Sequence, residues 1–329
     1  MNSRIFKKLL SLAVVSFVFV STLTSCGSNQ GNSADGVKVK LIMTDTKDAF
    51  RKNLSDNIKE QASSQGVNLT MVNTGDDVDK QAKEVRKAKS EGYKAIILRL
   101  SDAETALQMN VASNGLPIIY VNTQPNDEHL SDSEYIYVGS KEQDAGKYQA
   151  DYVYKKLNNP SSFNAIIFEG EKGHSGTIGR TSAVKKFFRQ KNVSVNYVFM
   201  DYANWTSEEA KAKFNTFMKT KQSVDAIFCN NDTMAIGAVE ALKENGLDPK
   251  KIPVCGVDAS KEGCQSIVDG DMSFTVLQDA ETQAEMAVKC ASLLGKGKSI
   301  KDVKYATDDG KYIWVPFKPV DSSNASQYK

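Results

Sequence analysis

From Val37 onward the sequence repeats one pattern: a short apolar run, a turn, and a segment with apolar residues on one helical face that ends at a glycine. In the first repeat, "VKVKLIM" is followed by apolar residues four positions apart between Phe50 and Ala62, and Gly66 comes after them. The apolar runs predict buried strands, and the spacing of four predicts helices. Strands that alternate with helices predict parallel sheets with helices on both faces.

The pattern forms two series, and a chain of 329 residues is longer than one hydrophobic core usually takes. The first series holds the apolar runs "VKVKLIM", "NLTMVN", "AIILRL" and "PIIYVN". The second follows "YIYVG" with "NAIIFEG", "NYVFMDY", "DAIFC", "IPVCGVD" and "SFTVLQD". A last helix is expected from Thr282 to Leu294 and a terminal strand from Tyr312 to Pro316. The predicted fold class is therefore α/β, with two doubly wound parallel-sheet domains.

The beginning of the chain has the features of an export signal. Arg4, Lys7 and Lys8 precede an acid-free apolar run of about a dozen residues, which is too short to span a bilayer. The run leads into "LTSCG", which resembles the lipobox of bacterial lipoproteins. That resemblance implies cleavage before Cys26 and attachment of lipid to this residue. The alternative is an ordinary signal peptide beside an incidental cysteine.

The predicted boundaries at this end are a lipoprotein signal peptide over residues 1–25 and a flexible, polar tether over residues 26–36. Removing the signal peptide takes away three basic residues and no acidic one, so the mature chain is close to neutral. A neutral chain argues against a nucleic-acid partner. We therefore expect a protein anchored by lipid at the extracytoplasmic face of the cell membrane.

The cysteines after Cys26 form no C-x-x-C pair. They are Cys229, Cys255, Cys264 and Cys290. The first two lie inside apolar runs, so the simplest interpretation is that these thiols are buried in a core. An exported chain could also form a disulfide, and this alternative stays open.

Polar and aromatic residues follow the predicted strands, at the edge where open α/β sheets bind ligands. They are Asp48, Asn122, the stretch "GHSGTIGR" over 173–180, Trp205, Asn231, Asp258 and Gln278. Carboxylates and amides bond pairs of hydroxyls, and aromatic faces cover the C–H faces of a sugar ring, so this set suits a hydroxyl-rich ligand. The set lacks the spacing of a metal site, and we expect neither a metal nor a cofactor. Each residue taken alone could equally be a turn or helix-cap residue.

The stretch "GHSGTIGR" raises the alternative of an enzyme with Ser175 as nucleophile and His174 as base. Adjacent side chains rarely face each other, the G-x-S-x-G elbow is absent from the stretch, and no acid is placed to orient the histidine. "GKGKS" over 295–299 lacks the first glycine of a phosphate-binding loop, and no helix-turn-helix precedes Val37. We therefore expect neither an enzyme, nor a nucleotide binder, nor a DNA-binding regulator.

Longer motifs make the chain similar to a known family. They are "YVGSKEQDAG" from Tyr137, "GEKGHSG" from Gly170, "CNNDTMAIGAVEALK" from Cys229, "IPVCGVDA" from Ile252 and "TVLQDAETQA" from Thr275. Together and in this order they resemble the bacterial periplasmic sugar-binding proteins of the ribose and galactose type, and among these the galactose/glucose binders most closely. The resemblance covers essentially everything after the tether.

The resemblance implies the type I fold of that family, in which two α/β domains joined by three hinge strands close around one sugar. The implied domains are residues 37–139 with 280–311, and residues 140–279 with 312–329. The crossovers between them then fall near Gly139 to Lys141, Gln278 to Ala280 and Lys311 to Ile313.

The ligand contacts of the family carry over to nine positions of this sequence. The resemblance implies hydrogen bonds to sugar hydroxyls from Asp48, Asn122, His174, Asn231, Asp258 and Gln278. It also implies that Arg180 donates to the ring oxygen and that Phe50 and Trp205 cover the two ring faces. The implied protein is a monomer that binds a glucose- or galactose-like monosaccharide and hands it to an ABC transporter permease. The alternative is a receptor for another aldose or a 1-substituted glycoside that reports to a chemoreceptor or sensor kinase.

Three positions depart from the galactose/glucose binders. Gly176 stands where they have an acid that meets the anomeric end of the sugar, Thr123 replaces a lysine, and Gln278 replaces an asparagine. A missing charged hydrogen bond is worth about 1.5–3 kcal/mol, or roughly ten- to a hundredfold in affinity. Either another group replaces the acid or the ligand differs at that end. Their calcium loop is absent too, since residues 158–164 contain no carboxylate, and we expect no bound calcium.

Overall fold

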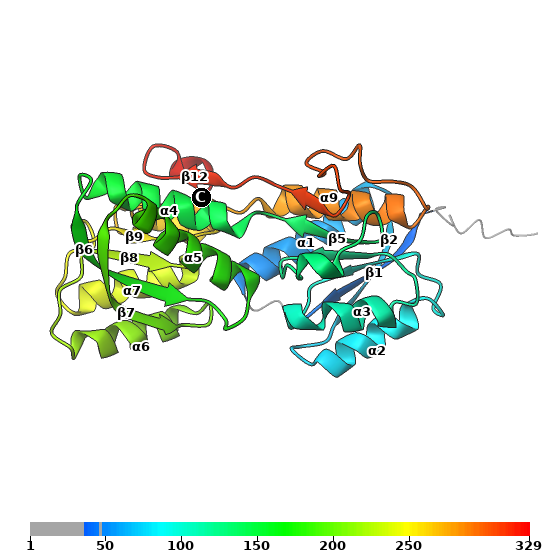
Figure 1. The fold of residues 1–329 in the computed structure, drawn as a ribbon, viewed down its shortest axis with the longest axis horizontal. Coiled ribbons are helices and arrows are strands. Elements are labelled where there is room, and N and C mark those ends of the chain that lie inside the picture. Colours follow the sequence, from blue (N-terminus) through cyan, green and yellow to red (C-terminus); the bar gives the residue numbers. More distant parts are fainter. Residues whose placement is uncertain (1–35, 46–47) are drawn as a thin grey trace, which may run out of the picture. The chain divides into compact units, whose positions relative to one another are not determined.

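The computed structural model describes residues 36–45 and 48–329. The predicted signal peptide and its lipidation site at Cys26 lie outside these residues. The described elements form two lobes, each with its own sheet and cores (Figure 1). The first lobe comprises residues 36–139 and 280–314, and the second comprises residues 140–279 and 315–329. None of the described helices combines the length and the apolar character that a membrane span requires.

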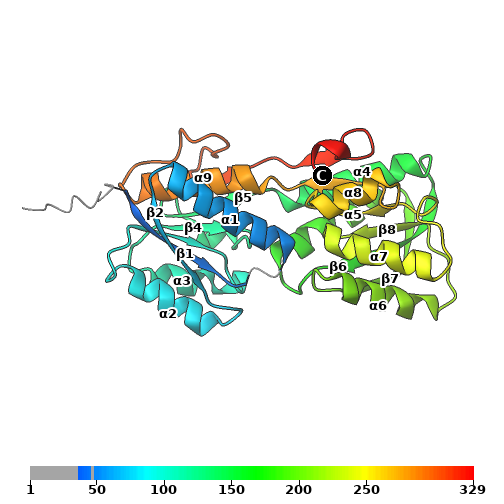
Figure 2. The ribbon, with the colours of Figure 1, turned by 180° about the vertical axis from the view of Figure 1, so that it is seen from behind.

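The first lobe contains a six-stranded sheet in which every strand pairing is parallel. Its order is β11-β5-β4-β3-β1-β2, where the strands are β1 (Lys38–Met43), β2 (Asn68–Asn73), β3 (Ala95–Leu98), β4 (Ile118–Val121), β5 (Tyr135–Gly139) and β11 (Tyr312–Trp314). Helices α1 (Ala49–Ser64) and α9 (Ala280–Leu294) cover one face (Figure 2), and α2 (Val78–Ala88) and α3 (Ala106–Ala112) cover the other. The short 3-10 helices η1 (Ala103–Thr105) and η2 (Asp127–His129) lie in the connections.

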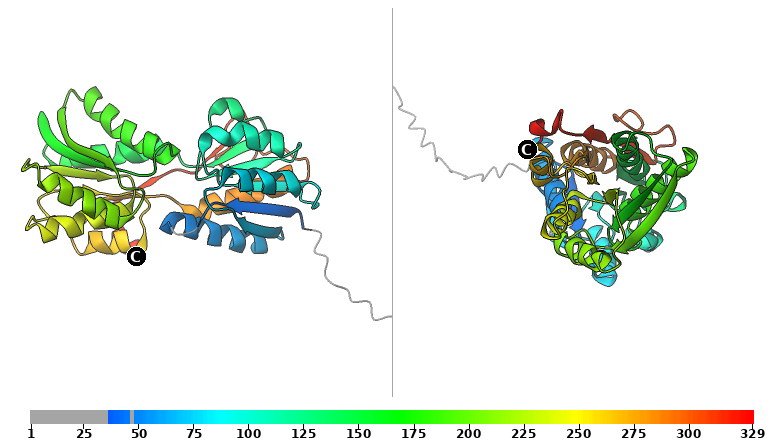
Figure 3. Two further views of the ribbon diagram at one scale, coloured as in Figure 1. Left: turned by 90° about the horizontal axis from the view of Figure 1, so that it is seen from below. Right: turned by 90° about the vertical axis from the view of Figure 1, so that its left-hand side faces the viewer.

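The second lobe repeats this arrangement with a smaller parallel sheet of order β7-β6-β8-β9. Its strands are β6 (Ser162–Glu169), β7 (Ser194–Tyr202), β8 (Ala226–Cys229) and β9 (Val254–Cys255). Helices α4 (Glu142–Lys156) and α5 (Ser175–Gln190) cover one face, and α6 (Ser207–Met218), α7 (Asp232–Glu244) and α8 (Lys261–Val268) cover the other (Figure 3). Because strands and helices alternate as the sequence pattern predicted, the α/β fold class with parallel sheets is confirmed.

One strand of the second lobe was not predicted. Strand β12 (Lys318–Val320) pairs antiparallel with β10 (Thr275–Leu277), and parallel bridges join Phe274 and Leu277 to the β9 side of the sheet. Its middle residue is Pro319, which cannot donate to a strand ladder and is therefore found at a sheet edge. A strand of three residues with two exposed positions leaves no apolar run to recognise in the sequence. The 3-10 helix η3 (Ala325–Gln327) follows it near the end of the chain.

The chain passes between the lobes after β5, after β10 and after β11. The third crossover was predicted near Lys311 to Ile313, whereas in the structure the chain crosses after Trp314. Residues Tyr312, Ile313 and Trp314 pair in parallel with residues 137–139 of β5, so they belong to the first lobe and the chain crosses after them. The physical reason is that Ile313 is fully buried in the core of the first lobe, while the hydroxyl of Tyr312 donates to Asp127 Oδ1 at 2.8 Å.

The cysteines that follow the described N-terminus lie within these cores. Cys229, Cys255, Cys264 and Cys290 are all buried as free thiols. Burial raises the pKa of each thiol, because the charged thiolate is poorly solvated in an apolar core. They therefore act as small apolar side chains, which agrees with the simplest interpretation of the sequence.

Candidate ligand-binding site

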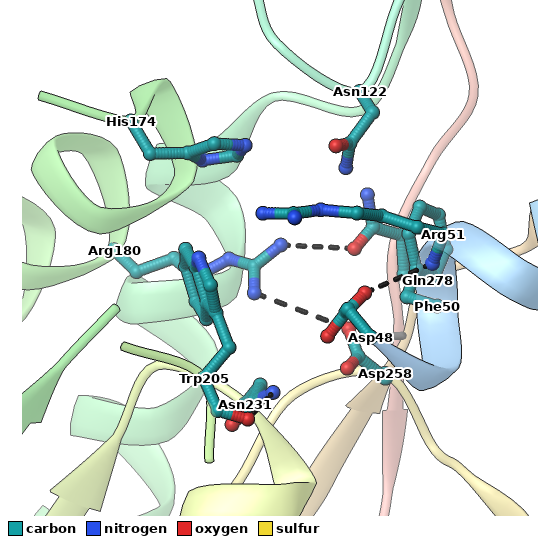
Figure 4. A pocket seen from close by; sticks show the side chains of 10 residues that line it. All are labelled: Asp48, Phe50, Arg51, Asn122, His174, Arg180, Trp205, Asn231, Asp258 and Gln278. Carbon is teal, nitrogen blue, oxygen red and sulfur yellow. Dashed lines mark hydrogen bonds and ion pairs between the residues drawn. The ribbon is translucent and has the colours of Figure 1, made fainter. Parts of the chain in front are cut away.

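A cavity lies where the carboxyl ends of strands from both lobes meet. Its lining consists of Asp48, Phe50, Arg51, Asn122, His174, Arg180, Trp205, Asn231, Asp258 and Gln278 (Figure 4). The structure thus brings together all nine residues that the sequence pointed to, and it adds Arg51. The space among these side chains amounts to about 280 Å³, part of it open to solvent.

Three of the lining residues are helix N-caps. The side chain of Asp48 accepts a hydrogen bond from the backbone N–H of Arg51, that of Asn231 accepts from Met234, and Nδ1 of His174 accepts from Gly176. A helix that follows a parallel strand begins at the carboxyl edge of the sheet, so its cap lies where a ligand can bind. The helix-cap and ligand-site interpretations of these residues are therefore compatible.

Three other lining residues have a strained backbone. Asn122, Trp205 and Asp258 adopt φ values of 61°, 66° and 120°, a region that residues with a Cβ rarely occupy. Trp205 is the most unusual because of its bulk, and its backbone carbonyl accepts a hydrogen bond from Asn231 Nδ2 at 3.3 Å. Gly170 lies against the indole, since a Cβ at this position would overlap the ring. Strain of this kind concentrates at functional sites, where the surrounding structure holds it in place.

The buried guanidinium of Arg180 is held by residues from three directions. Its Nε donates to Glu142 Oε2 at 2.6 Å, and its Nη1 and Nη2 donate to the carbonyl of Asn230 and to Gln278 Oε1 at 2.9 Å. Burial by itself lowers the pKa of Arg180, but Glu142 and Asp258 outweigh it and raise the pKa above the ordinary value. Arg180 is therefore a fixed cation that faces the cavity in one orientation.

Two buried polar atoms of the site have no hydrogen-bond partner among the described residues. Nε2 of Gln278 and Nε1 of Trp205 are buried and make no hydrogen bond with the described residues. Burial raises the pKa of Asp48 and Asp258, and the positive charges of Arg51 and Arg180, respectively, oppose this rise. Buried polar groups are normally satisfied, so the two unpartnered N–H donors, together with the buried carboxyl groups beside them, point to a ligand with several hydrogen-bonding groups.

His174 and Ser175 do not form a nucleophile and base. Nδ1 of His174 accepts from the backbone N–H of Gly176 at 3.0 Å, which leaves the ring proton on Nε2, 3.4 Å from Thr123 Oγ1. The hydroxyl of Ser175 instead accepts from the backbone N–H of Gln124 at 3.0 Å. Both residues contact the segment after β4, so the stretch "GHSGTIGR" serves to join the lobes and to line the cavity.

Two charged residues near the cavity were missed in the sequence. Arg51 was overlooked because it lies beside the apolar stripe of α1, one position after Phe50. Arg99 does not line the cavity, but its Nε donates to Asn122 Oδ1 at 3.3 Å and its Nη1 to Thr44 Oγ1 at 2.8 Å. A basic residue inside the run "AIILRL" was the signal that could have identified Arg99, because a cation in a buried strand needs partners.

Comparison with known proteins identifies the family of the chain that forms this site. The family model described as "Periplasmic binding protein domain" matches residues 39–299. The chain belongs to the periplasmic binding protein family. It is therefore a solute-binding protein that acts outside the cytoplasm and not an enzyme, as the sequence predicted.

Individual relatives are similar along nearly their whole length. The D-galactose/methyl-galactoside binding periplasmic protein MglB of Haemophilus influenzae is 27% identical over 98% of this chain and 99% of that protein. A putative rhizopine-binding protein of Rhizobium meliloti is 26% identical over 86% of this chain and 89% of that protein. Among solved structures, an ABC transporter solute-binding protein from Bacillus halodurans with bound myo-inositol has a TM-score of 0.78 and 26% identity. The aligned region covers 91% of this chain and 98% of the Bacillus halodurans protein.

The burial of His174 predicts a pH dependence of stability. Burial, followed by the charges of Arg99, Arg51 and Arg180, lowers the pKa of His174 well below its ordinary value. Below about pH 6.5 the unfolded chain takes up a proton that the buried imidazole of the native protein does not bind, so the contribution of His174 to the free energy of unfolding falls as the pH is lowered, by up to about 1.4 kcal/mol per pH unit.

Urea unfolding of the wild type and of His174→Gln, measured between about pH 7 and pH 5, tests this expectation. The substitution removes the titrating group, so the stability advantage of the wild type should shrink as the pH falls, while titration of the acids cancels in the comparison. A difference between the two proteins that stays constant with pH would contradict it.

Proposed function

We propose that this protein is a lipid-anchored extracytoplasmic receptor that binds one monosaccharide of the glucose or galactose type and delivers it to an ABC transporter. The make-up of the cavity carries the proposal: Phe50 from the first lobe and Trp205 from the second, with carboxylates, amides and guanidinium groups between them (Figure 4). Aromatic faces suit the C–H faces of a pyranose, and the polar groups suit its hydroxyls.

The named relatives support both parts of the proposal. The Haemophilus protein is by name a binder of galactose and methyl-galactoside, and the Bacillus halodurans protein is a solute-binding protein of an ABC transporter. We therefore take a transporter permease as the principal partner. A chemoreceptor or sensor kinase that recognises the same sugar-bound form is the alternative partner.

A ring without a free anomeric hydroxyl is a second candidate ligand, and Gly176 favours it. The galactose/glucose binders have an acid at this position, which this chain lacks. A 1-substituted glycoside or a cyclitol has no anomeric hydroxyl for such an acid to accept. The Bacillus halodurans relative contains a ligand of the cyclitol kind, myo-inositol.

Calorimetric titration tests the ligand class. We expect D-glucose, D-galactose, methyl β-D-galactoside or myo-inositol to bind with a dissociation constant in the micromolar range or below. Trp205→Ala should weaken this binding about tenfold or more, because the ring loses its stacking partner. Trp314→Phe is the matched control, since Trp314 lies in β11 and does not line the cavity. Failure of all four compounds to bind more tightly than about 1 mM would overturn the proposal.

Gly176→Asp tests the choice between a free sugar and a substituted ring. A Cβ at position 176 would lie 3.1 Å from His174 Nδ1 and 3.6 Å from Arg180 Cζ, so a side chain fits after a small shift of the imidazole. The added carboxylate should raise the affinity for D-glucose or D-galactose about tenfold relative to methyl β-D-galactoside. Gly176→Asn controls for shape without charge. An equal effect on the free and the methylated sugar would show that position 176 does not contact the anomeric end.

Cys26→Ser tests the lipid anchor. The substitution removes the thiol that would receive the lipid, so the protein should move from the membrane fraction to the soluble extracytoplasmic fraction. Fractionation followed by immunoblotting measures the distribution, with Ser28→Ala in the tether as the control. A Cys26→Ser protein that stays with the membranes would rule out anchoring through this residue.

A further inference from the structure

A cluster of buried charges joins the two lobes beside the cavity. Arg51 lies in the first turn of α1, and Arg99 directly follows β3; both are in the first lobe. Glu171 lies in the second lobe, in the connection between β6 and α5. The two guanidinium groups are almost completely buried, with side-chain exposures of 4% and 1%, whereas that of Glu171 is 37%.

Glu171 binds both arginines at once. Nη2 of Arg51 donates to Oε1 and Oε2 of Glu171 at 2.7 Å each, and Nη2 of Arg99 donates to Oε2 at 3.4 Å. A guanidinium that contacts both carboxylate oxygens makes a strong and directional pair. Glu171 is therefore the carboxylate that lies between two cations of the opposite lobe.

The first lobe by itself balances these cations incompletely. Arg51 also pairs with Asp45 at 3.1 Å, whereas the ion pair of Arg99 within the first lobe is a 3.7 Å contact to the exposed Asp76. Burial and the nearby charge of Arg51 lower the pKa of Arg99 to about 10. Moving the second lobe away would therefore leave two neighbouring guanidinium groups without the carboxylate that separates their charges.

The cluster is connected to the ligand site on both sides. Arg51 lines the cavity, and Arg99 binds the side chain of Asn122, which also lines it. The backbone carbonyl of Glu171 accepts a hydrogen bond from the N–H of His174 at 3.2 Å. Glu171 itself does not line the cavity, so it acts through residues that do.

We propose that Glu171 is a positioning residue that latches the two lobes through Arg51 and Arg99 and thereby sets how slowly the ligand leaves. The proposal rests on the proposed function, because it requires a ligand in the cavity. While the latch is formed, the guanidinium of Arg51 is held in the cavity lining and the lobes stay together over the ligand. Release of the ligand requires the Glu171 contacts to break first.

Stopped-flow tryptophan fluorescence with D-galactose and myo-inositol as probes tests the proposal. Glu171→Gln should raise the dissociation rate about tenfold or more, while the association rate changes by less than about threefold. Glu171→Asp keeps the charge on a shorter side chain and should restore part of the slow dissociation. Glu169→Gln is the matched control, because Glu169 lies two residues earlier and its side chain makes no ion pair with the described residues.

Two further measurements distinguish the loss of the Glu171 contacts between the lobes from a general loss of stability. In an Arg51→Met background, Glu171→Gln should change the dissociation rate much less than it does in the wild type. Raising the salt concentration from about 0.05 to about 0.5 M should speed dissociation from the wild type and have less effect on Glu171→Gln. Equal dissociation rates for the wild type and Glu171→Gln, or additive effects of the two substitutions, would overturn the proposal.

Failure of the proposed function gives a different result. If none of D-glucose, D-galactose, methyl β-D-galactoside and myo-inositol binds, the ligand assignment fails. Small-angle scattering of the ligand-free protein then tests the contacts between Glu171 and the two arginines. The radius of gyration should be larger for Glu171→Gln than for the wild type and for Glu169→Gln. An unchanged radius would overturn the latch independently of the ligand.

Discussion

The buried guanidinium of Arg180 constrains much of the second lobe, because a cation removed from water must be paired and hydrogen-bonded on all sides. Its partners come from three parts of the chain: Glu142 at the start of α4, the carbonyl of Asn230 after β8, and Gln278 after β10. Gln278 directly follows β10, and Glu142 lies three positions after the end of β5, so both are close to places where the chain crosses between the lobes. The hydrogen bonds of Arg180 therefore connect the ligand cavity to two of the three crossovers.

Parallel strands supply the second constraint. All strands of such a sheet end at the same edge, and each is followed by a helix whose first N–H groups need a cap. Asp48, His174 and Asn231 provide caps and at the same time line the cavity. The local requirement for capping and the requirement for polar groups around a ligand are therefore met by the same residues, which is why strand-end positions in the sequence were informative.

The contacts between the two lobes could not be predicted from the sequence. Arg51 and Glu171 are 120 positions apart, and no periodicity relates them. Strand β12 and the place of Tyr312 in the first sheet were missed for a similar reason, since short strands depend on their neighbours and carry little pattern of their own. The nine residues carried over from the family could be found in the sequence because each lies at or near the end of a predicted strand, in a short segment that can be matched by itself.

The sequence by itself determined the alternation of strands and helices, the α/β class and the set of residues at the strand ends. These features follow from the spacing and the chemistry of residues that are close together in the chain. Tertiary structure decided where the chain crosses after β11, how Arg180 is held, and that Arg51 and Arg99 share Glu171. These are contacts between distant segments, and their energies depend on burial and on distances that exist only once the lobes have folded against each other.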